Sequence, residues 1–157
     1  MNEQDVDELL AVLAQHGHSG IDPTEDQLRQ LLSGEQEGPF HFVNLLRFSD
    51  TASYPEGHEL SGEAVSGAEA YDRYGAVAFA QVTQRGGRLM TLNTVQQQII
   101  GKEAGWHRVA TMEYQSISAF VEMLLDPDYQ AALVHRNAGL AATEVIATRP
   151  LIDAPLG

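Results

Sequence analysis

The sequence predicts an α+β domain whose strands and helices alternate in the order β-α-β-β-α-β. A segment rich in aromatic and branched residues begins at residue 39, and a long segment with helically spaced apolar residues follows it. Two further strand-like segments are joined by a short loop flanked by glycines, and a second helical segment precedes the last strand. Hydrophobic residues make up 43% of the 157 residues, which is enough for one buried core.

The first half of this order follows from local patterns. Residues 39–48 (PFHFVNLLRF) are apolar on both faces of a strand, so both faces are expected to be covered. Residues 49–66 have no period and predict a long loop, a kind of segment that tends to be functional. A helix is expected over residues 67–84, and the glycine pair at 86–87 ends it.

The second half completes a ferredoxin-like arrangement. Residues 88–100 and 106–114 predict two antiparallel strands. A helix begins after Ser116, breaks and restarts at residues 126–127 (DP), and precedes a last strand over residues 140–149. Two helices cover only one face of a four-stranded antiparallel sheet, and the other face also carries apolar residues. We therefore expect a homodimer in which two such faces pack together.

Acidic side chains are concentrated in the first 38 residues, which hold nine acidic residues and one basic residue. Two short helices are expected there, and the second one is predicted to begin with Asp22 as N-cap and Pro23 at the first position. Their narrow apolar stripes need another surface, either the main domain or a partner protein. The chain is thus divided into an acidic helical extension, a ferredoxin-like domain and a tail, which span residues 1–38, 39–150 and 151–157.

The charge and composition exclude several classes of function. The formal net charge of −13 repels nucleic acids and anionic membranes, so we expect neither as a partner. The absence of cysteine removes disulfides, thiolate nucleophiles and zinc–thiolate sites. No segment has the ~20 apolar residues of a membrane span, and no signal-peptide pattern is visible, so a cytoplasmic protein is expected.

Short motifs in a fixed order resemble the domain-of-unknown-function 1330 family of the dimeric α/β-barrel superfamily, over about residues 39–150. They are residues 43–48 (VNLLRF), 70–71 (AY), 74–75 (YG), 86–88 (GGR), Trp106, Phe120, Met123, 126–130 (DPDYQ) and Arg136. The resemblance implies a ferredoxin-like protomer, a back-to-back sheet dimer and a small-molecule cavity in each protomer. It implies no reaction, because superfamily relatives include monooxygenases, haem-degrading enzymes, lactone isomerases and polyketide cyclases.

Two side chains are candidates for proton transfer, Tyr74 and His107. The first lies on a helix within a resembling motif, where the alternative is a core tyrosine with a hydrogen-bonded hydroxyl. No two histidines share a face of a helix at i, i+4 spacing, so no metal site is expected.

Six side chains are candidates for substrate binding: Asn44, Arg47, Tyr71, Arg88, Tyr129 and Arg136. Asn44 lies among aromatic and apolar residues and either orients a substrate carbonyl or ties a neighbouring loop. Arg47 lies on the opposite strand face, where it either clamps a carboxylate or pairs with Asp50 or Glu113. Tyr129 and Arg136 are two helical turns apart, so both are able to face the sheet.

The leading functional hypothesis is an enzyme without metal or organic cofactor that acts on a small organic substrate. Isomerisation, cyclisation, lyase or oxygen-dependent monooxygenase chemistry would fit a pocket under the 49–66 loop, between the sheet and the helices. The alternatives are a non-catalytic small-molecule binder with the same pocket and a structural homodimer without a ligand. A perturbed titratable group in a pocket favours the enzyme, a lining of apolar and amide groups favours the binder, and the lack of a cavity favours the structural role.

Overall fold

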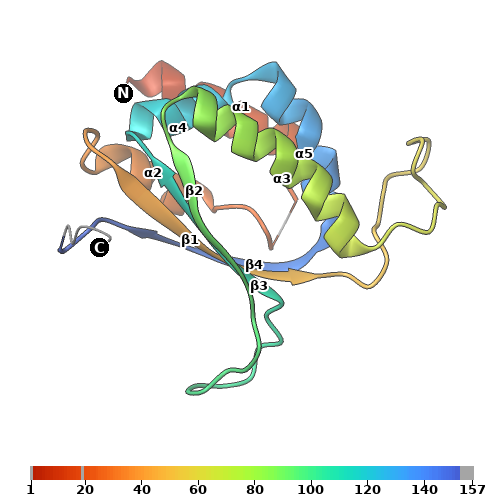
Figure 1. The fold of residues 1–157 in the computed structure, drawn as a ribbon. Coiled ribbons are helices and arrows are strands. Elements are labelled where there is room, and N and C mark those ends of the chain that lie inside the picture. The colour runs from red at the N-terminus through yellow and green to blue at the C-terminus, as the bar shows by residue number, and fades with distance from the viewer. Residues whose placement is uncertain (1, 19, 153–157) are drawn as a thin grey trace.

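The computed structural model describes residues 2–18 and 20–152, which form four strands and five helices (Figure 1). The N-terminal segment contributes two helices, α1 (Glu3–His16) and α2 (Glu25–Ser33). The remaining elements follow in the order β1 (Phe40–Phe48), α3 (Gly67–Gln84), β2 (Arg88–Thr94), β3 (Arg108–Tyr114), α4 (Ile117–Leu124), α5 (Pro127–Gly139) and β4 (Leu140–Thr148). The predicted ferredoxin-like α+β class is confirmed.

The four strands form one antiparallel sheet in the order β2-β3-β1-β4. Asn44 in the middle of β1 is paired with Ala110 of β3 and Val145 of β4. The prediction that the two middle strands run over residues 88–100 and 106–114 was wrong, because the ladder stops at Thr94 and Arg108. Leu46 is the last residue of β1 that pairs with β3, and its partner there is Arg108. The residues that precede Arg108 therefore lie beyond the part of the sheet in which β1 pairs with β3.

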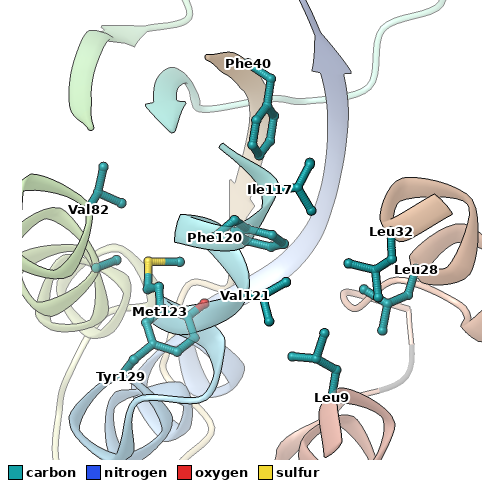
Figure 2. Packing of buried hydrophobic residues seen from close by; sticks show 11 residues of the cluster. Leu9, Leu28, Leu32, Phe40, Val82, Ile117, Phe120, Val121, Met123 and Tyr129 are labelled. Atoms are coloured by element: carbon teal, nitrogen blue, oxygen red, sulfur yellow. The ribbon is translucent and has the colours of Figure 1, made fainter. Parts of the chain in front are cut away.

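Every helix lies on one side of the sheet (Figure 1). The two N-terminal helices join this layer, because Leu9, Leu28 and Leu32 are buried in the same cluster as Phe40 and Phe120. Figure 2 shows these leucines directed from α1 and α2 toward the side chains of α4. Residues 2–18 and 20–38 therefore extend the helix layer and do not cover the opposite face of the sheet.

The expected start of the second helix was wrong. Thr24 is the N-cap of α2, and it exchanges hydrogen bonds with Gln27 in a capping box. Asp22 instead accepts a hydrogen bond at 2.8 Å from Nη1 of Arg136. The Asp22 carboxylate, which the local pattern assigned to the start of the helix, thus forms a long-range ion pair with Arg136 instead.

The face of the sheet that lies away from the helices carries an apolar centre and a charged edge. Val43 and Ile146 are paired across β1 and β4, and the Ile146 side chain is 52% exposed. On the same face, Glu113 bridges His41 at 3.0 Å and Arg88 at 3.1 Å. Among the described residues, no helix is long and apolar enough to cross a membrane.

Candidate functional site

The 49–66 loop is anchored on the close crossing of α3 and α5. Ser49 accepts a hydrogen bond from the Gly67 N–H at 3.0 Å and donates to the Gly139 carbonyl at 2.9 Å. A Cβ on Gly67 would lie only 2.7 Å from the Gly139 oxygen, so the crossing requires glycine there. The loop then packs Tyr54 and Val65 onto small residues of the two helices. This packing fixes the loop to a rigid support.

The loop brings a tyrosine and two histidines together. The Tyr54 hydroxyl lies 2.7 Å from Nδ1 of His135 on α5. The His58 ring stacks on the Tyr54 ring at 4.6 Å between centroids and meets the His135 ring edge-on at 6.0 Å. Nδ1 of His58 accepts a hydrogen bond from the Leu60 N–H at 3.1 Å. We refer to Tyr54, His58 and His135 as the loop cluster.

Electrostatics keep the hydrogen-bonded pair of the loop cluster neutral. Burial lowers the pKa of His135, and the neighbouring His58 and Arg73 lower it further, while Glu59 opposes them. Burial also raises the pKa of the Tyr54 phenol, although Arg73 partly offsets this. At neutral pH the pair is therefore a neutral imidazole bonded to a neutral phenol, so one nitrogen of the His135 ring carries no proton and is able to act as a general base.

An open hollow of about 570 Å³ lies beside the loop cluster. Its walls are both charged and apolar, and they comprise Glu59, Leu60, Glu63, Ala64, Val65 and Arg73. Arg73 is exposed and has no hydrogen-bond or ion-pair partner within the described residues. Arg73 also lowers the pKa of both Tyr54 and His135. The charge at the hollow is therefore electrostatically coupled to the loop cluster.

A second polar group lies inside the helix layer, and we call Tyr71, Tyr74, Tyr129 and Arg136 the interior cluster. The hydroxyls of Tyr74 and Tyr129 are 2.8 Å apart, and the Tyr71 and Tyr74 rings are 5.3 Å apart. Burial raises the pKa of Tyr71 and of Tyr129 well above the usual range, so both phenols keep their protons. Burial alone would lower the pKa of Arg136, but Tyr74, Tyr129 and Asp22 reverse this and raise it. Its guanidinium is held by Asp22 and by the Ile21 carbonyl.

The structure thus brings together four of the eight residues singled out in the sequence, and it places the other four elsewhere. Asn44 donates to the carbonyls of Phe42 and Ala110, both at 3.1 Å, so it ties β1 to β3 rather than to a neighbouring loop. Arg47 is exposed on the opposite face, where it binds the Ala104 carbonyl rather than Asp50 or Glu113. Arg88 pairs with Glu113.

His107 is not a neighbour of Tyr74. Its Nδ1 accepts a hydrogen bond from the Phe48 N–H at 3.0 Å, and its ring stacks on Phe48. Phe48 in turn contacts Tyr71, so two aromatic rings separate the two residues considered for proton transfer. Among the described residues, no three His, Asp or Glu side chains are gathered as a metal site.

Sequence reasoning missed the loop cluster and Arg73. The only available signal was the length of the 49–66 loop, since nothing in the sequence relates Tyr54 or His58 to His135, which follows about eighty residues later. The expected pocket lay between the sheet and the helices. The hollow lies instead between residues 59–65 of the loop and Arg73 of α3.

The fold and this site define a ferredoxin-like α+β protein with a loop-covered helix layer. Residues 60–149 match the family described as a domain of unknown function (DUF1330). The match spans more than half of the chain, and the chain belongs to this family, which confirms the expected resemblance.

Solved structures extend the comparison. The methylated RPA0582 protein is 35% identical with a TM-score of 0.76, and the match covers 85% of this chain and 96% of that chain. RPA0582 from Rhodopseudomonas palustris, described as a protein of unknown function, is 34% identical with a TM-score of 0.76, over 86% of this chain and 99% of that chain. These shares exceed residues 39–157, so the likeness extends into the N-terminal segment. A dabb family protein with a ferredoxin-like fold from Mesorhizobium loti has 18% identity and a TM-score of 0.44, over 73% and 99% of the two chains. No curated protein matches this chain.

Proposed function

We propose that this protein is a cofactor-independent enzyme that moves a proton on a small organic anion bound in the hollow that Arg73 and residues of the 49–66 loop line. The observation that carries the proposal is the 2.7 Å hydrogen bond between Tyr54 and His135, close to Arg73, which has no hydrogen-bond or ion-pair partner in the described part of the chain. The perturbed pKa of His135 favours catalysis over passive binding. The cytoplasmic location remains a prediction.

Each side chain has a distinct role in this proposal. Arg73 binds the carboxylate or another anionic group of the substrate and orients it in the hollow. His135, neutral at physiological pH, removes a proton from the substrate carbon next to the anionic or carbonyl group. In this proposal Nδ1–H of His135 donates to the Tyr54 hydroxyl oxygen, which orients the ring and leaves Nε2 unprotonated as the base. Return of the proton at a neighbouring carbon completes an isomerisation that needs no co-reactant.

The first experiment is a thermal-shift screen of small organic anions against the full chain. We expect hits whose stabilisation is lost in Arg73→Gln and kept in Arg29→Gln, a matched control on exposed α2 that lies outside the hollow. Retained stabilisation in Arg73→Gln would remove the hollow as the binding site.

The second experiment separates the enzyme from the non-catalytic binder. We expect the wild-type protein to exchange a carbon-bound proton of the hit with deuterium from D2O, as followed by proton NMR. His135→Gln should abolish this exchange while the hit still stabilises the protein. Binding without exchange in the wild-type protein would establish the binder instead.

A second copy of the chain is the partner that we propose for the uncovered sheet face. The helix layer and the N-terminal helices all lie on the opposite side, while Val43 and Ile146 present an apolar centre (Figure 1). Light scattering should report a dimer, and Val43→Glu should dissociate it. A wild-type species of 17.1 kDa at micromolar concentration would contradict the proposal.

A further inference from the structure

Ile21 and Asp22 enter the helix layer immediately before α2. The Ile21 side chain is 7% exposed and packs with Leu46, Phe48 and Leu140. The Asp22 carboxylate lies 2.8 Å from Nη1 of Arg136, and its second oxygen accepts the His18 N–H. Two adjacent residues thus place an apolar group and a carboxylate into one recess of the domain.

The arginine in this recess requires an anion. The side chains of Arg136 and Asp22 are only 14% and 19% exposed, so both charges are largely removed from water. Besides Asp22, the guanidinium binds the Ile21 carbonyl, so both of its partners come from the same two residues. A buried ion pair is a poor source of stability compared with an apolar pair of the same volume. Stability alone therefore gives little reason for a buried arginine at this position.

The surroundings of Arg136 add recognition features. The rings of Tyr71 and Tyr74 lie 5.3 Å apart, the Tyr74 and Tyr129 hydroxyls share a hydrogen bond of 2.8 Å, and burial raises the pKa of Tyr129, so that its phenol keeps its proton. A guanidinium beside protonated phenols and aliphatic side chains is complementary to a carboxylic acid with a branched apolar body.

We propose that this recess is a second ligand site, specific for small branched carboxylic acids, and that Ile21 and Asp22 occupy it as an internal stand-in. The ligand carboxylate replaces that of Asp22 on Arg136. The apolar body of the ligand takes the place of the Ile21 side chain against Leu46, Phe48 and Leu140. No bond is made or broken, and the site does not depend on the proposed chemistry in the hollow.

Binding at this site must move the N-terminal segment. Asp22 is two residues before the N-cap of α2, and Gly20 has a φ of +90°, a conformation that suits a sharp change of chain direction. When the ligand displaces Asp22, the His18 N–H also loses its carboxylate acceptor. Occupancy of the recess is thereby coupled to release of Ile21 and Asp22 from the domain.

The direct test removes the stand-in and supplies the ligand class. The probe is 4-methylpentanoate, and the matched neutral compound is 4-methylpentanamide. We expect the double variant Ile21→Ala, Asp22→Asn to bind the probe at least tenfold more tightly than the wild-type protein by calorimetry at 10 °C, with circular dichroism confirming the fold. The amide should not bind. Equal affinities for wild-type protein and variant, or equal binding of acid and amide, would overturn the proposal.

A second measurement uses the wild-type protein, so the test does not depend on the folding of the variant. Millimolar probe should accelerate hydrogen exchange at the His18 and Ile21 amides, while the amide compound leaves exchange unchanged. Unchanged exchange at saturating probe would overturn the displacement. Arg73→Gln should not alter either result, because Arg73 lines the other site, so the two proposals fail independently.

Discussion

The interior cluster joins α3 to α5, whereas the loop cluster joins the 49–66 loop to α5, and the two differ in whether the charged groups at them already have partners. In the interior cluster, the Tyr74 and Tyr129 hydroxyls satisfy each other, and Asp22 neutralises Arg136. At the loop cluster, the neighbouring Arg73 has no described partner and faces an open hollow. The difference teaches that burial and aromatic content do not identify a site by themselves. At the hollow the informative feature is Arg73, which has no partner among the described residues, whereas in the interior cluster Asp22 already occupies the anion position on Arg136.

The largest expected effect on stability separates the two clusters. Asp22→Ala leaves the buried Arg136 without its counter-ion, so it should lower the free energy of unfolding by about 3–5 kcal/mol in urea denaturation. The control is Glu25→Ala, which removes an exposed ion pair with Arg29 and should cost no more than about 1 kcal/mol. Equal effects of the two variants would show that the interior cluster does not depend on its ion pair.

A smaller loss of stability is expected from Tyr74→Phe. This variant leaves the buried Tyr129 hydroxyl without its partner, which should cost about 1–2 kcal/mol by the same measurement. Binding of anions in the hollow should persist, because Tyr74 does not line it. Loss of anion binding in a folded Tyr74→Phe protein would show that the two clusters belong to one site.

The loop cluster should show the reverse behaviour. Tyr54→Phe keeps the ring that packs on Val65 and removes only the hydroxyl that holds His135. We expect a change of at most about 1 kcal/mol in stability and a loss of proton exchange by roughly 10²-fold or more. An unchanged exchange rate would exclude Tyr54 from the chemistry.

The pH dependence sharpens the comparison at a single residue. The pKa of folded His135 is lowered from its ordinary value of 6.5, first by burial and then by His58 and Arg73. Between the lowered pKa and 6.5 the unfolded chain binds more protons than the folded one, so this residue makes stability fall as pH falls through that window. NMR titration should place the His135 pKa below 6.5, and Arg73→Gln should raise it. An unchanged His135 pKa in the Arg73→Gln variant would show that Arg73 does not act electrostatically on the loop cluster.

The topology was predictable because each element carries its own local signal. The aromatic and branched residues of β1, the Ser116 cap and the Asp126-Pro127 restart are patterns that a few neighbouring residues determine, and the structure has all of them. The ends of β2 and β3 were not predictable in the same way. They depend on where β1 stops offering a partner, which is a property of the assembled sheet.

The two clusters were predictable to different degrees for a related reason. Helical spacing placed Tyr71 with Tyr74 and Tyr129 with Arg136 on shared faces, and the packing of α3 on α5 then joined the pairs. The prediction that Asp22 is a helix N-cap was wrong. A carboxylate before a proline is a common helix start, but the actual partner of Asp22 is Arg136, which is far away in the sequence. Tyr54 and His58 lie in a loop, where no period relates one residue to another.

The central claim is that the group with the missing partner, Arg73 beside the Tyr54–His135 pair, is where a ligand binds. NMR titration of the wild-type protein with the tightest anion from the thermal-shift screen tests it most directly, with the arginine side chains and histidine rings labelled. The account predicts that the Arg73 Nε and His135 ring resonances shift first and in parallel. Shifts confined to Arg136 and the interior tyrosines, with Arg73 and His135 unmoved at saturation, would contradict it.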